Sequence, residues 1–232
     1  MGSAASTRPA RAQLGILVGA LAYVAMALAC LRQSGAAQPW SGLDLFSGGF
    51  LALLLISAGT VLLLGRRLFI SSSALRQAAG ITYDRGTLLI APALVAGDAL
   101  VFLDYGHWHL TRALERAPLQ AVGLVLGAAG MALIARTDAQ LVKHFGDERS
   151  AKALMTTGPF RYIRHPRYAG ILGVRAAFAL SFASAIGWGL AAGWLIVLLR
   201  RIRLEEAYLR AEFGDSYERY AARTSRLIPG LY

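Results

Sequence analysis

Five long stretches of the chain carry almost no charge, and each is long enough to matter for membrane insertion. They cover residues 14–31, 45–64, 88–103, 119–135 and 168–199. A helix needs about 20 mostly apolar residues to cross the hydrocarbon core of a bilayer. Charged residues make up only 16% of the chain, whereas soluble domains have about 25%. The sequence therefore predicts an all-α, polytopic membrane protein and excludes a disordered chain, which would be far less apolar.

The last apolar stretch, residues 168–199, is too long for one ordinary span. As a straight helix it would reach about 48 Å, so it forms either one steeply tilted helix or a hairpin of two helices. Residues 181–187 contain small side chains and Gly187, which suit a turn. With a hairpin and a cytoplasmic N-terminus, 20 of the 24 Lys and Arg residues lie on the cytoplasmic side, as the positive-inside rule expects. We therefore expect about six transmembrane segments, the last two a short hairpin, followed by a cytoplasmic C-terminal helix.

The chain is expected to form one integral membrane domain, residues 1–232, in which residues 1–135 supply variable transmembrane helices. Both termini are then cytoplasmic. The formal net charge of +11 follows the loops, so it predicts contact with anionic lipid and no nucleic-acid partner. The 22 Arg against 2 Lys are typical of a GC-rich genome and favour a bacterial inner membrane. No metal site is expected, because Asp104, His107 and His109 lack the spacing of a helical ligand pair.

A basic, proline-containing segment covers residues 158–170, directly before the last apolar stretch. Pro166 disfavours a helical His165 and suits the first turn of a helix, so the membrane helix is expected to begin here. Its free N–H groups would lie beside basic and aromatic side chains. These are Tyr162, Arg164, His165, Arg167 and Tyr168. Gly170 permits close approach to the backbone. Two interpretations remain open: a site for a carboxylate or phosphate of a ligand, or a loop that contacts lipid headgroups.

An acidic doublet follows the last apolar stretch, on a segment that reads as a helix ending near Gly214. Glu205 lies four residues after Arg201, and Glu206 lies four residues before Arg210. This spacing is typical of i,i+4 ion pairs on a solvated helix. The alternative is that the two carboxylates meet the basic segment at the cytoplasmic membrane surface and form a site.

Two charged residues, Asp98 and Arg175, lie within the apolar stretches. A charge in the membrane costs at least about 2.5 kcal/mol, so each is expected to face a partner or a cavity. They either pair with each other or line the substrate cavity, and the two possibilities are compatible.

Taken together, the C-terminal motifs resemble the superfamily of isoprenylcysteine carboxyl methyltransferases and phospholipid methyltransferases, which are integral membrane enzymes. The matching motifs are Gly-Pro-aromatic at 158–160, Arg-His-Pro-x-Tyr-x-Gly at 164–170, Glu-Glu-x-x-Leu at 205–209, Phe-Gly-x-x-Tyr-x-x-Tyr at 213–220, and Pro229. They occur in family order over residues 154–229, about a third of the chain. The earlier apolar stretches match only in hydropathy.

The resemblance implies S-adenosylmethionine as the cofactor, bound by residues 154–232 without a Rossmann fold. It implies that the cofactor is lined by Tyr162, Arg164, His165, Pro166, Tyr168 and Gly170. One or both of Glu205 and Glu206 would hold its polar groups. Arg201 would contact the substrate or orient the glutamates, which gives Arg201, Glu205 and Glu206 as the expected catalytic residues.

The expected function is methyl transfer to a membrane-soluble acceptor. An isoprenylcysteine-type carboxylate is the first choice by similarity, and a phospholipid amine, a thiol or another small lipophilic acceptor stays open. An NADPH-dependent reductase of the sterol-reductase type is the alternative, because those enzymes share an Arg-His-Pro loop and an ending like residues 227–232. A non-catalytic membrane protein is the third possibility.

Overall fold

The computed structural model describes residues 4–32, 43–56, 59, 85–110, 116–145 and 153–231, and within these ranges the chain is helical with no strand. The elements are α1 (Ala4–Leu31), a helix at Leu45–Ile56, α3 (Arg85–Leu103), the π-helix η1 (Asp104–Trp108), α4 (Ala117–Phe145), the 3-10 helix η4 (Gly158–Arg161), α5 (Pro166–Ser181), α6 (Ala185–Phe213) and α7 (Asp215–Ala221). The predicted all-α class is confirmed.

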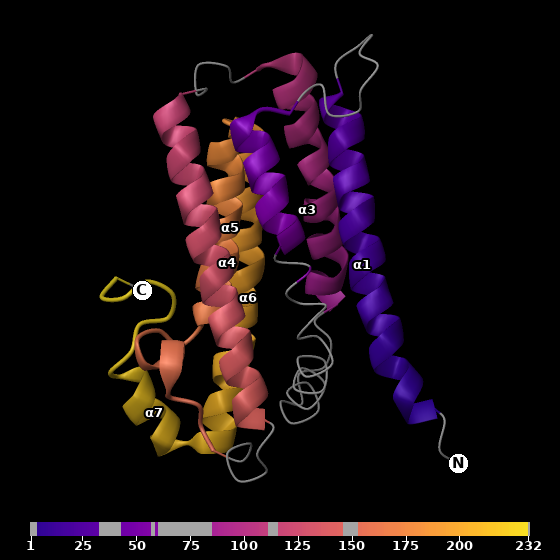
Figure 1. Cartoon of the computed structure of the whole chain (residues 1–232). Helices are drawn as coiled ribbons and strands as arrows, with labels where there is room; N and C mark the ends of the chain where they lie inside the picture. Colours follow the sequence, from indigo (N-terminus) through magenta and orange to yellow (C-terminus); the bar gives the residue numbers. More distant parts are fainter. Residues whose placement is uncertain are drawn as a thin grey trace.

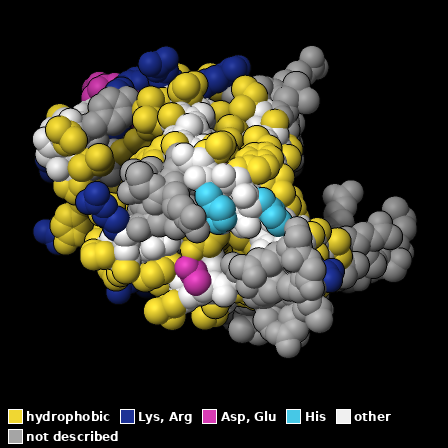
Figure 2. Space-filling view, turned by 90° about the horizontal axis from the view of Figure 1, so that it is seen from above, with side chains coloured by type: hydrophobic (Ala, Val, Ile, Leu, Met, Phe, Trp, Pro, Cys, Tyr) yellow, Lys and Arg dark blue, Asp and Glu magenta, His cyan; other side chains and the backbone are white. Residues whose placement is uncertain are grey.

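The long helices run roughly side by side, and α7 lies at the same end of the bundle as the start of α1 (Figure 1). By length and composition, α4 and α6 could each cross a membrane. Hydrophobic side chains reach the outer surface around much of the bundle when it is viewed along the helices (Figure 2). This is the exterior expected of a membrane protein. Six spans and the cytoplasmic side of the termini stay predictions. Residues 57, 58 and 60–64 of the second apolar stretch lie outside the described residues.

The hairpin in the last apolar stretch is confirmed, and its turn lies at residues 182–184. Ala183 takes a left-handed conformation with φ 47°, and Ser184 caps α6 by accepting a hydrogen bond from the N–H of Gly187 at 3.3 Å. Gly187 lies within α6 and serves close packing, because a Cβ there would come within 2.9 Å of Ala179 Cα. The predicted turn region was right, but the glycine was assigned the wrong role.

The second helix of the hairpin is longer than predicted. α6 runs for 29 residues without interruption, so the membrane segment and the exit helix are one element. Its course between Gly193 and Gly214 contains neither glycine nor proline, and i,i+4 pairs such as Arg201–Glu205 at 3.3 Å favour continued helix. One rigid helix therefore connects the apolar core to the acidic doublet.

α4 packs closely along α5 through glycines. A Cβ on Gly130 would lie 2.9 Å from the carbonyl oxygen of Gly170, and a Cβ on Gly170 would lie 2.8 Å from that of Gly130. Small residues at helix interfaces allow such backbone contact, which is a common way for helices to associate in membranes. This packing fixes the start of α5, where the basic motif lies.

An aromatic cluster fills the core where α1, the helix at Leu45–Ile56, α3 and the α5–α6 turn meet. Phe102 packs edge-on against Phe178 and Phe182 with ring centroids 5.5 and 5.2 Å apart. Next to this cluster, Asp104 accepts hydrogen bonds from the N–H of Leu110 at 2.8 Å and from Ser184 at 3.2 Å. The carboxylate thus joins the end of η1 to the hairpin turn.

Candidate active site

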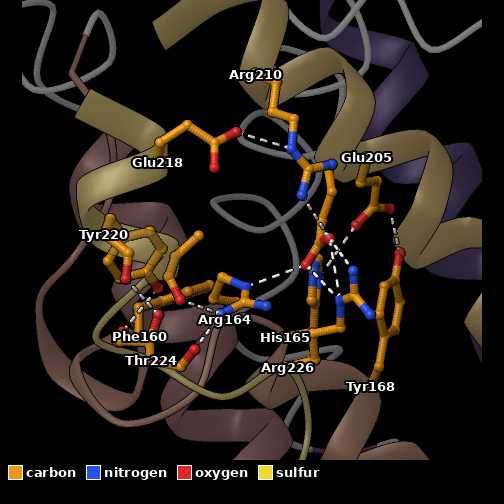
Figure 3. A network of polar contacts seen from close by, with 12 residues as sticks. Phe160, Arg164, His165, Tyr168, Glu205, Arg210, Glu218, Tyr220, Thr224 and Arg226 are labelled. Carbon is orange, nitrogen blue, oxygen red and sulfur yellow. Dashed lines mark hydrogen bonds and ion pairs between the residues drawn. The ribbon is translucent and has the colours of Figure 1, made fainter. Parts of the chain in front are cut away.

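The two C-terminal motifs meet at the end of the α5–α6 hairpin (Figure 3). Arg164 and His165 directly precede α5, while Glu205 and Glu206 lie in the last third of α6. The Nε atom of Arg164 donates to Oε1 of Glu206 at 3.1 Å, across 42 positions of sequence. The predicted convergence of the basic segment and the acidic doublet is therefore present in the structure.

Glu206 is the buried centre of this network, with only 1% of its side chain exposed. Three arginines hold its two oxygens. They are Arg164 at 3.1 Å, Arg226 at 3.0 Å and Arg210 at 3.4 Å. These charge-assisted contacts balance the negative charge of the buried carboxylate, so the protein itself offsets the cost of burying it. Its oxygens are already occupied, so Glu206 holds the site together more than it offers a free group to a ligand.

The arginines set the ionisation of Glu206, which lies beyond the apolar part of α6 and after Arg200, Arg201 and Arg203. Burial alone would raise the pKa of Glu206. Contacts with His165, Arg226 and Arg164 outweigh it and hold the pKa well below its usual range. Glu206 is therefore ionised at neutral pH.

Glu205 has a different environment, since 22% of its side chain is exposed. Its Oε1 accepts hydrogen bonds from the hydroxyl of Tyr168 and, at 3.3 Å, from Nη2 of Arg201. Its Oε2 lies 3.7 Å from Nδ1 of His165 and accepts no hydrogen bond from the described residues. Glu205 therefore presents an accessible carboxylate oxygen, which Glu206 does not.

His165 lies between the two glutamates and stacks on Tyr168, with ring centroids 5.7 Å apart and planes inclined by 12°. Its Nε2 is 3.4 Å from Glu206, close enough for electrostatic contact but too poorly aligned for a hydrogen bond. Among the described residues this buried nitrogen has no hydrogen-bond partner. A buried polar atom without a hydrogen-bond partner indicates that a bound ligand supplies the partner.

The segment after α7 runs back along the basic motif and completes the network. Ile163 and Ser225 form a parallel bridge, and the N–H groups of Arg164 and His165 donate to the carbonyls of Ser225 at 2.8 Å and Arg226 at 3.0 Å. Nη1 of Arg164 also donates to the carbonyls of Ala221 and Thr224. The Nε and Nη1 atoms of Arg164 are thereby engaged with the protein. Arg226 was not identified from the sequence.

The two tyrosines of α7 are buried, and Tyr220 fixes this segment against the loop. The hydroxyl of Tyr220 donates to the carbonyl of Phe160 at 2.7 Å, and burial raises the pKa of Tyr220 to about 12. Tyr217 is completely buried beneath Arg210, whose guanidinium carbon lies 5.5 Å from the ring centroid. Burial, followed by the charge of Glu206, raises the pKa of Tyr217. Both hydroxyls therefore stay protonated.

The other residues expected in the site have different positions. Tyr162 is 66% exposed and takes no part in the network, while Pro166 is buried as the first residue of α5. The close approach that Gly170 permits is with α4. The contacts of these three residues with a cofactor stay predictions.

The two charged residues of the apolar stretches, Asp98 and Arg175, pair with each other. Nη1 of Arg175 donates to both carboxylate oxygens of Asp98, at 2.9 and 2.7 Å, and the hydroxyl of Tyr23 donates to Asp98 at 3.0 Å. The pair connects α1, α3 and α5. That these two residues also line the substrate cavity stays a prediction.

The site therefore has two parts. A compensated cluster around Glu206 fixes the loop, α6 and the chain after α7 relative to one another. Beside it lies an open group of side chains, formed by His165, Tyr168, Arg201 and Glu205. This open group offers a carboxylate, a guanidinium and flat rings together, which suits a small ligand that carries both charges and an aromatic group.

Comparison with known proteins agrees with the motifs. The sequence model of the phospholipid methyltransferase family matches residues 116–216, from α4 to the start of α7. The chain is also 39% identical over 80 residues to the Protein-S-isoprenylcysteine O-methyltransferase of Schizosaccharomyces pombe. That match covers 33% of each chain, so this chain spans about a third of the length of that curated relative. No solved structure matches. The resemblance seen in the sequence is thus confirmed: residues 116–216 match the phospholipid methyltransferase family, and a third of the chain is similar to an isoprenylcysteine methyltransferase.

Proposed function

We propose that this protein is a membrane methyltransferase that uses S-adenosylmethionine to methylate a membrane-soluble acceptor. The observation that supports this most is the meeting of the Arg-His-Pro loop and the Glu-Glu doublet in one polar network at the end of an apolar hairpin. The phospholipid methyltransferase match includes both motifs.

The open part of the site fits this cofactor. The free Oε2 of Glu205 can accept hydrogen bonds from an ammonium or ribose hydroxyl groups, and Arg201 can meet a carboxylate. The stacked rings of His165 and Tyr168 offer an aromatic surface. The cofactor, when bound, supplies a methyl group on positively charged sulfur.

The chain's own residues would contribute alignment and exclusion of water. Tyr168 packs with Leu198, Ile202 and Leu227 in a buried apolar cluster that borders the polar network. A carboxylate or thiolate acceptor needs no general base, so a dry and correctly oriented site is sufficient. For an amine acceptor, Glu205 is the accessible carboxylate that could take up the proton.

The acceptor is proposed to enter from the bilayer and the cofactor from the cytoplasm, at the inner membrane of a bacterium. An isoprenylcysteine-type carboxylate is the first acceptor to test, because the fungal relative carries that name. A phospholipid amine is the second, since the matching family is described as phospholipid methyltransferase.

A cofactor titration tests the proposal. S-adenosylhomocysteine, the demethylated product, should stabilise the detergent-purified chain against heat, by roughly 2.7 kcal/mol at 100 times its Kd. Glu205→Gln should weaken this binding about tenfold, because a hydrogen bond to a charged group is lost.

Glu212→Gln is the matched control for this titration: it is the same change at an exposed position of the same helix, and it should bind like the wild type. Stabilisation by NADPH and not by S-adenosylhomocysteine would instead favour the reductase.

A further inference from the structure

A second polar position lies deeper in the seam between α5 and α6. At the active site, Nε of Arg201 donates to the hydroxyl of Tyr168 at 3.2 Å. Seven residues further along each helix, the guanidinium of Arg175 lies over the ring of Trp194, 4.9 Å from its centroid. Seven helical residues correspond to about 10 Å, so the antiparallel register places this second position about 10 Å from the first.

The guanidinium of Arg175 is only partly used by its carboxylate partner. Both hydrogen bonds to Asp98 come from Nη1, so Nε and Nη2 have no hydrogen-bond partner among the described residues. The Arg175 side chain keeps 16% of its surface exposed, whereas Asp98 is fully buried. The indole N–H of Trp194 is buried and also lacks a partner in the described part of the chain. Several N–H donors therefore gather at one place without an acceptor from the residues that the structure describes.

Unmet donors are costly in this environment, because apolar helices and the acyl chains of lipids cannot accept hydrogen bonds. The charges of Arg175 and Asp98 already balance each other. A further ionised group would be uncompensated here, while a neutral oxygen would satisfy the donors without adding charge. A carbonyl or ester oxygen has this chemistry.

We propose that Arg175 and Trp194 bind a neutral carbonyl oxygen of the methyl acceptor, about 10 Å from the atom that receives the methyl group. The inference rests on the proposed function and narrows its acceptor. An ester-linked glycerolipid with a headgroup nucleophile carries oxygens at such a separation, whereas the prenyl chain of an isoprenylcysteine carries none. The Arg175–Trp194 position thus selects the class of acceptor, while the part of the site near Glu205 holds the group that receives the methyl.

A matched pair of lipids tests this directly. The probes are dioleoylphosphatidylethanolamine, which has two ester carbonyls, and its di-O-oleyl ether analogue, which has none. Each is titrated onto the full detergent-purified chain and quantified by native mass spectrometry. The wild type should bind the ester lipid about tenfold more tightly, the low end of the effect of a hydrogen bond from a charged group.

Two variants assign the preference to the named residues. Arg175→Met combined with Asp98→Asn removes both charges together, and it should bind the two lipids equally while keeping its affinity for S-adenosylhomocysteine. Trp194→Phe keeps a ring beneath the guanidinium and removes only the Nε1 donor. It should lower the preference about twofold even if the double variant fails to fold.

The inference is overturned by equal affinity of the wild type for the two lipids, by binding of neither, or by a preference that survives both sets of substitutions. These outcomes are separable from failure of the proposed function. Binding of S-adenosylhomocysteine without an ester preference removes only the inference. An ester preference without S-adenosylhomocysteine binding removes the methyltransferase proposal and leaves the lipid site.

Discussion

Replacing Glu206 by glutamine tests whether the buried cluster holds the active site together. Glu206→Gln keeps the size of the side chain and removes the charge that compensates Arg164, Arg226 and Arg210. Removing one partner of a buried ion pair costs roughly 3–5 kcal/mol. Arg210 adds little because 44% of its side chain is exposed, and the glutamine can still accept a hydrogen bond. We therefore expect a loss of about 3 kcal/mol.

Thermal unfolding of the detergent-purified protein, followed by tryptophan fluorescence, measures this loss. For a chain of this length about 3 kcal/mol lowers Tm by about 6–12 °C. Glu218→Gln is the matched control, since Glu218 pairs with Arg210 at 3.0 Å but is 59% exposed. Its loss should be at most about 1 kcal/mol.

The effect of Glu206 should also depend on pH, because its pKa in the folded protein is depressed. A depressed carboxyl pKa stabilises the folded state fully above the unfolded value of about 4.3, and this contribution is lost as the pH falls toward the folded pKa. The Tm difference between wild type and Glu206→Gln should be constant near neutral pH and should shrink below about pH 4.3. Equal Tm losses for Glu206→Gln and Glu218→Gln would refute the reasoning.

Two further substitutions test the open part of the site and the helix packing. Tyr168→Phe removes the hydroxyl that donates to Glu205. The affinity for S-adenosylhomocysteine, measured by calorimetry, should therefore fall about tenfold while the helix content stays unchanged. Full affinity of the variant would contradict the place of Tyr168 in the site. Gly130→Ala puts a Cβ 2.9 Å from the carbonyl of Gly170 and should cost about 1–3 kcal/mol in thermal unfolding. Gly189→Ala, whose Cβ meets nothing within 4 Å, should leave Tm unchanged or higher, and equal shifts for the two would argue against this packing.

Local signals in the sequence located the helical hairpin and the central pairings. Small residues and charge asymmetry predicted the turn that the structure has at Ala183, and Pro166 marked the first residue of α5. The i,i+4 spacing predicted the contact of Glu206 with Arg210, which is present at 3.4 Å. These features depend on neighbours within one or two helical turns, so the sequence contains them directly.

Features that depend on contacts between distant segments could not be predicted from the sequence in this way. Spacing alone favoured a solvated helix around Glu206, yet the carboxylate is buried because the loop before α5 and the segment after α7 close over it. Arg226 lies in a segment without helical periodicity. The bridge between Ile163 and Ser225, together with the hydrogen bond from the N–H of His165 to the carbonyl of Arg226, places it against Glu206. In the sequence, Arg226 is marked only by its position two residues after Thr224, beyond the motif that ends at Tyr220.

The position of Arg226 after α7 has a consequence for how the protein is made. Arg226 follows Glu206 by 20 residues and comes after α7, so the carboxylate of Glu206 has an incomplete set of counter-charges until the segment after α7 has folded back. Chains interrupted between α7 and Arg226 would be inserted but left with a loosened site. Newly made protein would thus become competent only once that stretch has been translated and has folded back onto the loop before α5 and onto Glu206.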